Sequence, residues 1–198
     1  VIVGSYHMLD HVPAGSHVVL PGLDLSEWPA TGDMLGRQAA DESGPVRVVH
    51  APSSRETKGT AHVLATVQAL RSRGVPLELV LVEGMSNAEA VQIYRTCDIA
   101  VDQLANGWYG VFALETMALG KPVLGYIRPD NADRLEAARA VRPPIVRVTA
   151  DTLAGELEGL AMDPGRRHDL GRLSRAFVEQ VHDIDGPAEQ VIAIYRQA

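Results

Sequence analysis

The sequence predicts an α/β protein built on a doubly wound parallel sheet of the Rossmann type, with a helical C-terminal tail. Strand-like and helix-like stretches alternate from Val46 onward, and the strand-like stretches are apolar at most positions. Strands that are apolar on both faces are typical of a parallel sheet covered by helices on both sides. Because crossovers between parallel strands are right-handed, a doubly wound topology follows. We therefore expect a sheet domain over residues 45–198 and a linker over residues 1–44.

Each element of this fold is predicted from a local pattern. Short apolar runs bounded by glycine, proline or polar residues predict strands at 46–51, 77–82, 99–104, 122–127 and 145–148. Apolar residues at helical spacing predict helices at 60–73, 87–95, 111–119 and 131–140, and tail helices at 151–162, 166–182 and 187–197. Residues 52–59 read as a loop.

The first part of the chain is punctuated rather than periodic. A short strand is expected at 18–20, and Trp28 is expected to anchor the loop around it. Residues 31–44 are polar and contain glycine, so we expect them to be mobile. The chain starts at Val1 rather than at a methionine, which suggests a fragment or a trimmed protein without a signal peptide.

Composition and charge narrow the classes of partner. The 198 residues are 46% hydrophobic, enough for a substantial core, and the net charge of -7 gives no reason to expect nucleic acid or an anionic membrane surface. No run approaches the ~20 apolar residues of a membrane span. Cys97 is the single cysteine, which excludes an internal disulfide and fits a cytoplasmic protein.

The stretch from Gly107 to Val123 carries the strongest signal. It combines a turn bracketed by Gly107 and Gly110 with an apolar helix that contains one carboxylate, Glu115. Such a helix is buried nearly all round, and a buried carboxylate needs a partner. Free N–H groups at the start of the helix suit an anion. This pattern predicts a site for a ligand with phosphate and hydroxyl groups. Alternatively, Glu115 pairs with a basic residue such as Arg128 or lies on an exposed helix edge.

A second group precedes the helix expected at 60–73. Arg55 and Lys58 lie there with Ser53 and Ser54, and cations, hydroxyls and a helix N-terminus together can hold a diphosphate. A solvated surface loop is the alternative for the two cations taken by themselves.

Polar residues at strand ends leave further alternatives. His50 ends the first strand of the sheet and is more often a hydrogen-bonded core residue than a ligand-binding one. Asp102 and Gln103 end the third strand, and they either point into a cleft or cap the next turn. His7 and His11 have a metal-binding spacing for a helix but lack a third ligand nearby, so no metal site is predicted.

Several enzyme classes lack their motifs. G-x-S-x-G, C-x-x-C and the full P-loop are absent from the sequence, as is G-x-G-x-x-G after the first strand. The sequence therefore gives no support for a hydrolase, a redox protein, an ATPase or a nicotinamide-dependent dehydrogenase.

Several motifs together resemble a known family. Lys58-Gly59 is followed by Glu83-Gly84 after an apolar strand, and then by the block Gly-Trp-Tyr-Gly-x-x-x-x-Glu-x-Met-Ala-x-Gly-x-Pro-Val from residue 107 to 123. Leu-Pro-Gly-Leu-Asp at 20–24 looks like the segment that leads into this family's C-terminal domain. The chain thus resembles the C-terminal, nucleotide-sugar-binding domain of GT-B-fold glycosyltransferases of the "group 1" family, one half of the complete fold.

The resemblance implies roles for individual residues. Arg55 and Lys58 would be the catalytic cations that neutralise the departing diphosphate, without a metal or other cofactor, and Glu115 would accept hydrogen bonds from the ribose. Donor contacts are expected at Ser53, Ser54, Glu83, Gly84, Tyr109, Gly110, Val111 and Glu115. The base would lie against the loop from Glu83 to Asn87, and the diphosphate against the backbone of residues 109–111.

The same resemblance implies a reaction and a missing partner. A hexose-type sugar would pass from a nucleoside diphosphate to an acceptor, with retention of configuration. The acceptor would be bound largely by an N-terminal domain that this chain lacks, so the chain alone would transfer little. Gly107 stands where the family has a further Glu that usually contacts the sugar. A non-catalytic nucleotide-binding or interaction domain and half of a sugar-nucleotide epimerase are therefore kept as alternatives.

Overall fold

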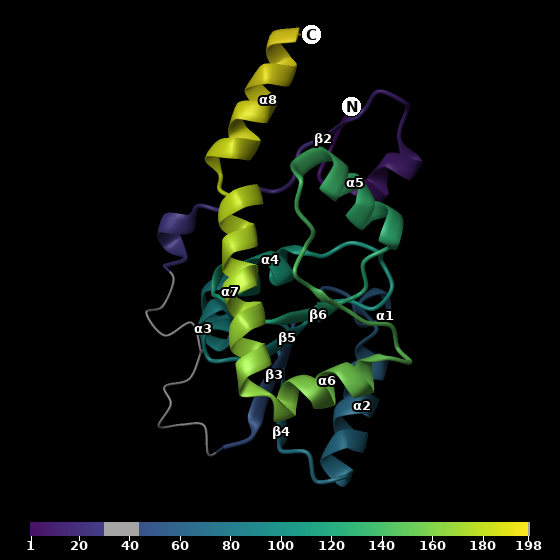
Figure 1. Cartoon of the computed structure of the whole chain (residues 1–198), viewed down its shortest axis with the longest axis vertical. Coiled ribbons are helices and arrows are strands. Elements are labelled where there is room, and N and C mark those ends of the chain that lie inside the picture. Colours follow the sequence, from purple (N-terminus) through teal and green to yellow (C-terminus); the bar gives the residue numbers. More distant parts are fainter. Residues whose placement is uncertain (30–43, 198) are drawn as a thin grey trace.

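The computed structural model describes residues 1–29 and 44–197, and its centre is a parallel sheet (Figure 1). Five strands pair in the order β4-β3-β5-β6-β7, and every pairing is parallel. The strands are β3 (Val46–His50), β4 (Leu77–Leu81), β5 (Ile99–Val101), β6 (Val123–Gly125) and β7 (Val146–Arg147). The predicted α/β class and Rossmann-like sheet are confirmed.

Helices cover both faces of the sheet. Two of them, α2 (Thr60–Ser72) and α6 (Leu153–Met162), share one apolar core, whereas α3 (Asn87–Arg95), α4 (Val111–Ala118), α5 (Pro129–Arg139) and α7 (Pro164–Val181) share the other. The remaining α-helices in the described ranges are the single-turn α1 (Arg55–Lys58) and the terminal α8 (Asp185–Gln197), which projects away from the sheet in Figure 1.

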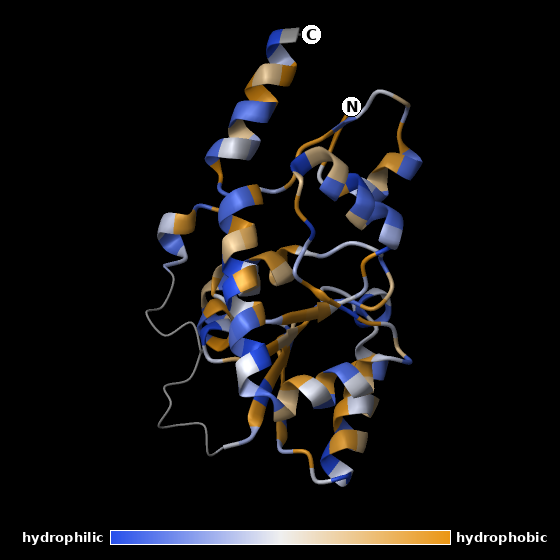
Figure 2. Ribbon diagram, in the orientation of Figure 1, coloured by the Kyte–Doolittle hydropathy of each residue, from blue (hydrophilic) through white to orange (hydrophobic). Residues whose placement is uncertain are grey.

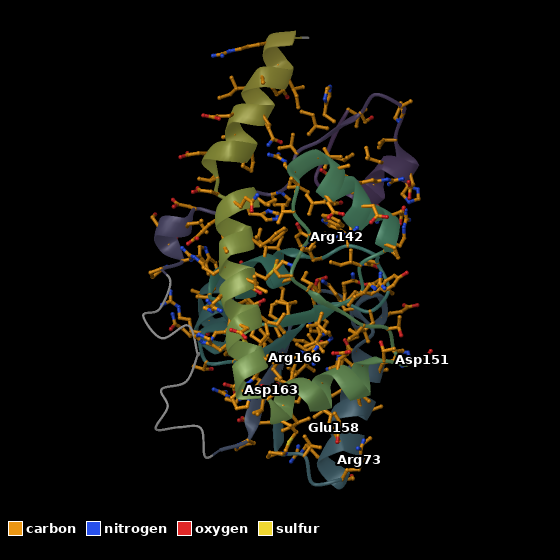
Figure 3. All side chains as sticks on the ribbon, in the orientation of Figure 1. Arg73, Arg142, Asp151, Glu158, Asp163 and Arg166 are labelled. Atoms are coloured by element: carbon orange, nitrogen blue, oxygen red, sulfur yellow. The ribbon has the colours of Figure 1, made fainter. Side chains whose placement is uncertain are left out.

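Alternation along the strands feeds these two cores. Val49 and Ala100 face the core with α4 and α7, whereas their neighbours Val48 and Ile99 face the core with α2 and α6. Figure 2 shows the central strands as largely hydrophobic ribbon between helices of mixed character. Arg73 follows α2 and Glu158 belongs to α6, the two helices of one core, and the two residues lie beside each other in Figure 3. Arg73 Nη2 donates to Glu158 Oε1 at 2.8 Å and so links the C-terminal end of α2 to α6.

The N-terminal segment, residues 1–29, forms its own small motif on the sheet domain. Its strands β1 (Ile2–Val3) and β2 (His17–Val18) pair in parallel. The short 3₁₀ helix η1 (Tyr6–His11) lies between them in the chain, and a second one, η2 (Leu25–Glu27), follows β2. The ring of Tyr6 packs edge-on against Trp108, and Trp28 is buried in the same core, as expected for an anchor.

Several predicted boundaries were wrong. Residues 55–58 are the helix α1 rather than loop, because Ser54 caps the turn and Gly59, at φ 72°, ends it. β5 stops at Val101 instead of residue 104 because the side chains of Asp102 and Gln103 bind the following loop. β4 is an edge strand that buries Leu77 but leaves residues 79–81 half-exposed. The linker strand is at 17–18, and residues 31–43 of the predicted mobile stretch lie outside the described residues.

The order of the strands defines where a ligand site is expected. From β3 the chain first moves to β4 on one side and then returns to β5 on the other side, so the winding direction reverses between β3 and β5. In open α/β sheets, ligands lie beyond the carboxyl ends of the strands at such a switch point. Among the described residues, no helix is long and apolar enough to cross a membrane.

Candidate functional site

The loops after β3 and β5 meet at the switch point through one buried ion pair. The Nζ atom of Lys58, at the end of α1, donates to Oδ1 of Asp102 at 2.6 Å. The other carboxylate oxygen of Asp102, Oδ2, accepts the backbone N–H of Gly110 at 2.7 Å. The two side chains of the pair are 11% and 1% exposed. A single carboxylate therefore joins the cation of the first loop to the start of α4.

The second predicted cation lies in a solvent-exposed pair. Arg55 donates from Nε and Nη2 to the two carboxylate oxygens of Glu83, at 2.9 and 2.6 Å. These hydrogen bonds hold the pKa of Glu83 below its ordinary value. Arg55 begins α1 and Glu83 follows β4, so this pair lies at the same edge of the sheet as Lys58 and Asp102. Both cations thus face carboxylates in the structure.

His50 is a hydrogen-bonded core residue, the role that the sequence favours. Its Nδ1 donates to the carbonyl of Val101 at 2.7 Å, so its Nε2 accepts the hydroxyl hydrogen of Thr60 at 2.9 Å. Burial lowers its pKa, and the ring is therefore neutral at physiological pH. It ties β3 to β5 and to α2 beneath the site.

Gln103 caps the turn that precedes α4. Its Nε2 donates to the carbonyls of Trp108 and Tyr126, and its Oε1 accepts the N–H groups of Ala105 and Asn106. The fully buried side chain therefore holds the loop in one conformation, which fixes the place where α4 begins.

The N-terminus of α4 presents backbone donors at the sheet edge. Gly110 is its N-cap and supplies no side-chain cap, and the N–H of Gly110 itself is taken by Asp102. The N–H groups of Val111, Phe112 and Ala113 have no acceptor within the helix, because a helix leaves its first donors free. Val111 is 58% exposed, so this end of α4 is open to solvent. Of the backbone donors predicted at 109–111, the N–H of Gly110 is therefore used by Asp102, whereas that of Val111 is one of the free donors of the helix.

Glu115 lies one turn further along α4 and is only 7% exposed. Its Oε1 accepts a hydrogen bond from Asn87 Nδ2, at the start of α3, at 3.1 Å. Burial raises the pKa of Glu115, and the Asn87 hydrogen bond partly offsets this shift. The pairing with Arg128 that was the alternative is wrong, because Arg128 binds Asp10 and Asp130. The exposed-edge alternative is also wrong.

Gly107 is held in a left-handed conformation that favours glycine. Its φ is +74°, and a Cβ atom there would lie 3.3 Å from Cδ of Arg128. The position of the family's additional Glu is therefore both left-handed and covered by the stem of Arg128. A glutamate here would need a strained backbone and a displaced arginine.

A pocket of about 200 Å³ lies between the N-terminal segment and the start of α4. Ser5 and His7 line it from one side, and Trp108, Gly110 and Val111 line it from the other. The Nδ1 atom of His7 is buried and has no hydrogen-bond partner in the described part of the chain. Burial, followed by the nearby charge of Arg128, lowers the pKa of this imidazole.

The wall of this pocket also contains a buried histidine, His182. His182 Nδ1 donates to the carbonyl of Pro21 at 2.7 Å, so its Nε2 accepts the hydroxyl hydrogen of Tyr109 at 2.8 Å. Burial lowers the pKa of His182 to about 4. The hydroxyl of Tyr109 is therefore used by His182, so a ligand could contact Tyr109 only through its backbone.

The remaining predicted contacts lie at the surface of this edge. Ser53 and Ser54 are exposed, with Ser54 accepting from the N–H of Thr57, and Gly84 lies in an exposed turn at φ +67°. His7 and His11 are on η1, and no group of three or more metal-ligating side chains occurs among the described residues. Sequence reasoning did not predict that Asn87 binds Glu115, considered His7 only as a metal ligand with His11, and left the role of Asp102 open.

Comparison with known proteins bears on the fold. No protein-family model and no curated protein sequence matches the chain. The structure is similar to sucrose-phosphate synthase from Thermosynechococcus elongatus, with a TM-score of 0.68 and 18% identity over 99% of this chain and 57% of that one. It is also similar to HepE from Anabaena, solved with UDP-glucose, with a TM-score of 0.69 and 14% identity over 100% of this chain and 63% of that one.

A third solved structure matches over its whole length. The C-terminal domain of LpcC, a group 1 glycosyl transferase from Francisella tularensis, gives a TM-score of 0.55 and 17% identity over 82% of this chain and 100% of that domain. These likenesses confirm the predicted fold, that of the C-terminal half of a GT-B glycosyltransferase. The chain spans 57% and 63% of the length of the first two structures.

Proposed function

We propose that the chain is the nucleotide-sugar-binding half of a glycosyltransferase that moves a hexose-type sugar from a nucleoside diphosphate to an acceptor. The observation that carries this proposal is the junction of Lys58, Asp102 and the uncapped start of α4 at the switch point. It places a cation beside free helix N–H groups, the combination that binds phosphate. The similarity to HepE, which was solved with UDP-glucose, supports it.

The donor would lie across the carboxyl edge of the sheet. Its diphosphate would meet Lys58 and the first turn of α4, and Arg55 would exchange Glu83 for a phosphate oxygen. Glu115 would accept hydrogen bonds from the ribose hydroxyls in place of Asn87, which already shows that the carboxylate can accept from this side. The base would lie against the exposed turn at Gly84.

The sugar would occupy the pocket beside Gly110. Its volume of about 200 Å³ is below the ~300–1,000 Å³ of sites for drug-sized ligands, so it suits a single ring rather than a whole nucleotide sugar. Ser5 and His7, the polar side chains on one side of this pocket, would bind sugar hydroxyls there. These side chains would replace the contact that Gly107 cannot make.

The chemistry we propose is stabilisation of the leaving group. Lys58, Arg55 and the helix N–H groups would neutralise the charge that develops on the departing diphosphate. We propose that this requires no metal and proceeds with retention. Transfer by the complete protein should then persist in excess EDTA, and loss of activity that Mg²⁺ restores would contradict the metal-free proposal.

Acceptor binding and closure of the cleft are assigned to an N-terminal domain outside this chain. Without that wall the donor would remain exposed to water, so the chain alone should bind nucleotides but transfer little. A cytoplasmic location and the absence of a nucleic-acid partner remain predictions from Cys97 and from the net charge.

Titration calorimetry with UDP, GDP and ADP tests the proposal. We expect saturable binding of at least one nucleotide and its loss in Glu115→Ala, whereas Glu189→Ala, which changes an exposed acid on α8, should bind like the wild type. No binding of any of the three up to millimolar concentration would reject the donor site and favour a non-catalytic interaction domain. Product analysis of the complete protein with UDP-sugars separates transfer from epimerisation.

A further inference from the structure

Asp102 occupies an unusual position for a carboxylate beside a site proposed for phosphate. Its side chain is 1% exposed, and each of its oxygens has a partner. A negative charge at this place would repel a phosphate unless a neighbouring cation neutralised it. Its two partners, Lys58 Nζ and the N–H of Gly110, come from segments 52 residues apart in the sequence.

The ammonium group of Lys58 lies directly against the backbone of Gly110. A Cβ atom on Gly110 would be 2.8 Å from Lys58 Nζ and 3.4 Å from Oδ1 of Asp102. Gly110 has an extended backbone, with φ -96° and ψ 178°, which any residue can adopt. The reason for a glycine here is therefore the space that the ammonium group fills.

This packing confines a flexible lysine to one place. Lysine has four rotatable side-chain bonds, and a buried ammonium is costly without a counter-charge. Asp102 supplies the counter-charge, and the missing side chain of Gly110 leaves room for the ammonium group. The lysine is thereby held at the first turn of α4, beside the free N–H groups of residues 111–113.

We propose that Asp102 is a positioning residue for the diphosphate of the donor. It fixes Lys58 Nζ against the start of α4, so that the ammonium and the helix N–H groups form one phosphate site. Asp102 does not touch the donor; it acts through Lys58. The inference rests on the proposed function and extends it by assigning the phosphate selectivity of the site to a residue that the family motif does not include.

A purely structural role for Asp102 makes a different prediction. If the carboxylate only capped the loop before α4, its loss would loosen the site for every ligand alike. If it positions Lys58, its loss should weaken ligands with a diphosphate and spare those without phosphate. The ratio of UDP to uridine affinity therefore separates the two roles, because uridine lacks the phosphates but keeps the base and ribose.

The test compares Asp102→Asn with the wild-type chain by chemical-shift titration with UDP and with uridine, which measures millimolar affinities. In Asp102→Asn the amide oxygen can still accept the N–H of Gly110, but the NH₂ group then faces the ammonium, donor against donor. We expect about tenfold weaker binding of UDP and unchanged binding of uridine.

Gly110→Ala is the second variant, and it keeps Asp102 intact. The added methyl group would displace Lys58 Nζ without backbone strain, so the same selective loss of UDP affinity is expected. Because both changes act through Lys58, the double variant should lose no more than the stronger single variant. Should Asp102→Asn fail to fold, Gly110→Ala with its wild-type carboxylate still decides the question.

The outcomes distinguish this inference from the proposed function. A wild-type chain that binds neither UDP nor uridine contradicts the proposed function itself when GDP and ADP also fail. A wild-type chain that binds UDP, with variants that bind UDP as well as or better than it does, overturns the role of Asp102 alone. Equal losses for UDP and uridine would also overturn it and leave Asp102 as a loop cap.

Discussion

Two ion pairs at the same edge of the sheet have the same separation and very different surroundings. In both, the closest nitrogen and oxygen are 2.6 Å apart. The side chains of Arg55 and Glu83 are 61% and 32% exposed, whereas those of Lys58 and Asp102 are 11% and 1% exposed. An exposed pair gains little because water and salt screen it, and a buried pair cannot lose one partner without leaving an isolated charge.

This difference assigns different tasks to the two cations. Arg55 can exchange Glu83 for a ligand phosphate at little cost, because both side chains are already solvated. If Lys58 left Asp102, the buried carboxylate would lose its counter-charge. Lys58 should therefore stay in place when a ligand binds. One pair is thus an exchangeable contact and the other is part of the framework of the site.

The largest expected effect comes from breaking the buried pair. Lys58→Met should destabilise the chain by about 3–5 kcal/mol, because it leaves Asp102 charged and buried without a cation. Urea unfolding measures this change. The double variant Lys58→Met/Asp102→Asn should recover part of the loss, since it removes the isolated charge.

The exposed pair supplies the control for this prediction. Arg55→Met should leave the urea midpoint almost unchanged, because both partners are open to water. If Arg55→Met and Lys58→Met shifted the midpoint equally, the contrast between the two pairs would be refuted.

A carboxylate that has an amide as its partner sharpens the comparison further. Within residues 1–29 and 44–197, Glu115 is paired with the amide of Asn87 and with no cation, and its raised pKa means that ionisation costs the folded state stability. The wild type should therefore lose stability as pH rises through the folded pKa of Glu115, and Glu115→Gln should not. Glu115→Gln should be the more stable protein at pH 7, and this advantage should vanish below the ordinary glutamate pKa of about 4.3.

The same variant should bind nucleotides less well. Loss of the charged acceptor for the ribose should weaken nucleoside affinity about tenfold. Urea unfolding at pH 7 and pH 4, together with a UDP titration, checks both effects. A variant that is no more stable at pH 7 would show that Asn87 fully compensates the burial of Glu115.

The smallest effect is expected from releasing the exposed arginine. Glu83→Gln removes the carboxylate that competes for Arg55, so UDP should bind roughly two- to fivefold more tightly at low salt. Raising the salt concentration to 0.5 M should reduce this gain, whereas weaker binding of UDP in Glu83→Gln would indicate that Glu83 itself contacts the donor.

Local patterns predicted most of the framework and little of the pairing within the site. The sheet, the buried helix α4 and the burial of Glu115 follow from apolar runs and helical spacing, which are properties of neighbouring residues. The partner of Lys58 does not, because Asp102 is 44 residues away and no local pattern links them. For the same reason Arg128 was considered for Glu115, although its charge is used by Asp10 and Asp130.

Short elements were the other source of error. α1 has four residues and carries no helical periodicity of its own, so its cap at Ser54 and its stop at Gly59 were the only signals. The two-residue strands β1 and β2 are too short for alternation to be recognised. Such elements are stabilised by what they pack against, which the sequence alone does not state.

The two hydrogen bonds of the His182 imidazole link three parts of the chain that are distant in sequence. Pro21 lies in the N-terminal segment, His182 is the C-cap of α7, and Tyr109 precedes the N-cap of α4. The neighbouring backbone bonds between Leu23 and residues 182 and 184 close the same junction. A displacement of Pro21 would therefore either break its hydrogen bond with His182 or be passed through this imidazole to Tyr109, the residue before the N-cap of α4.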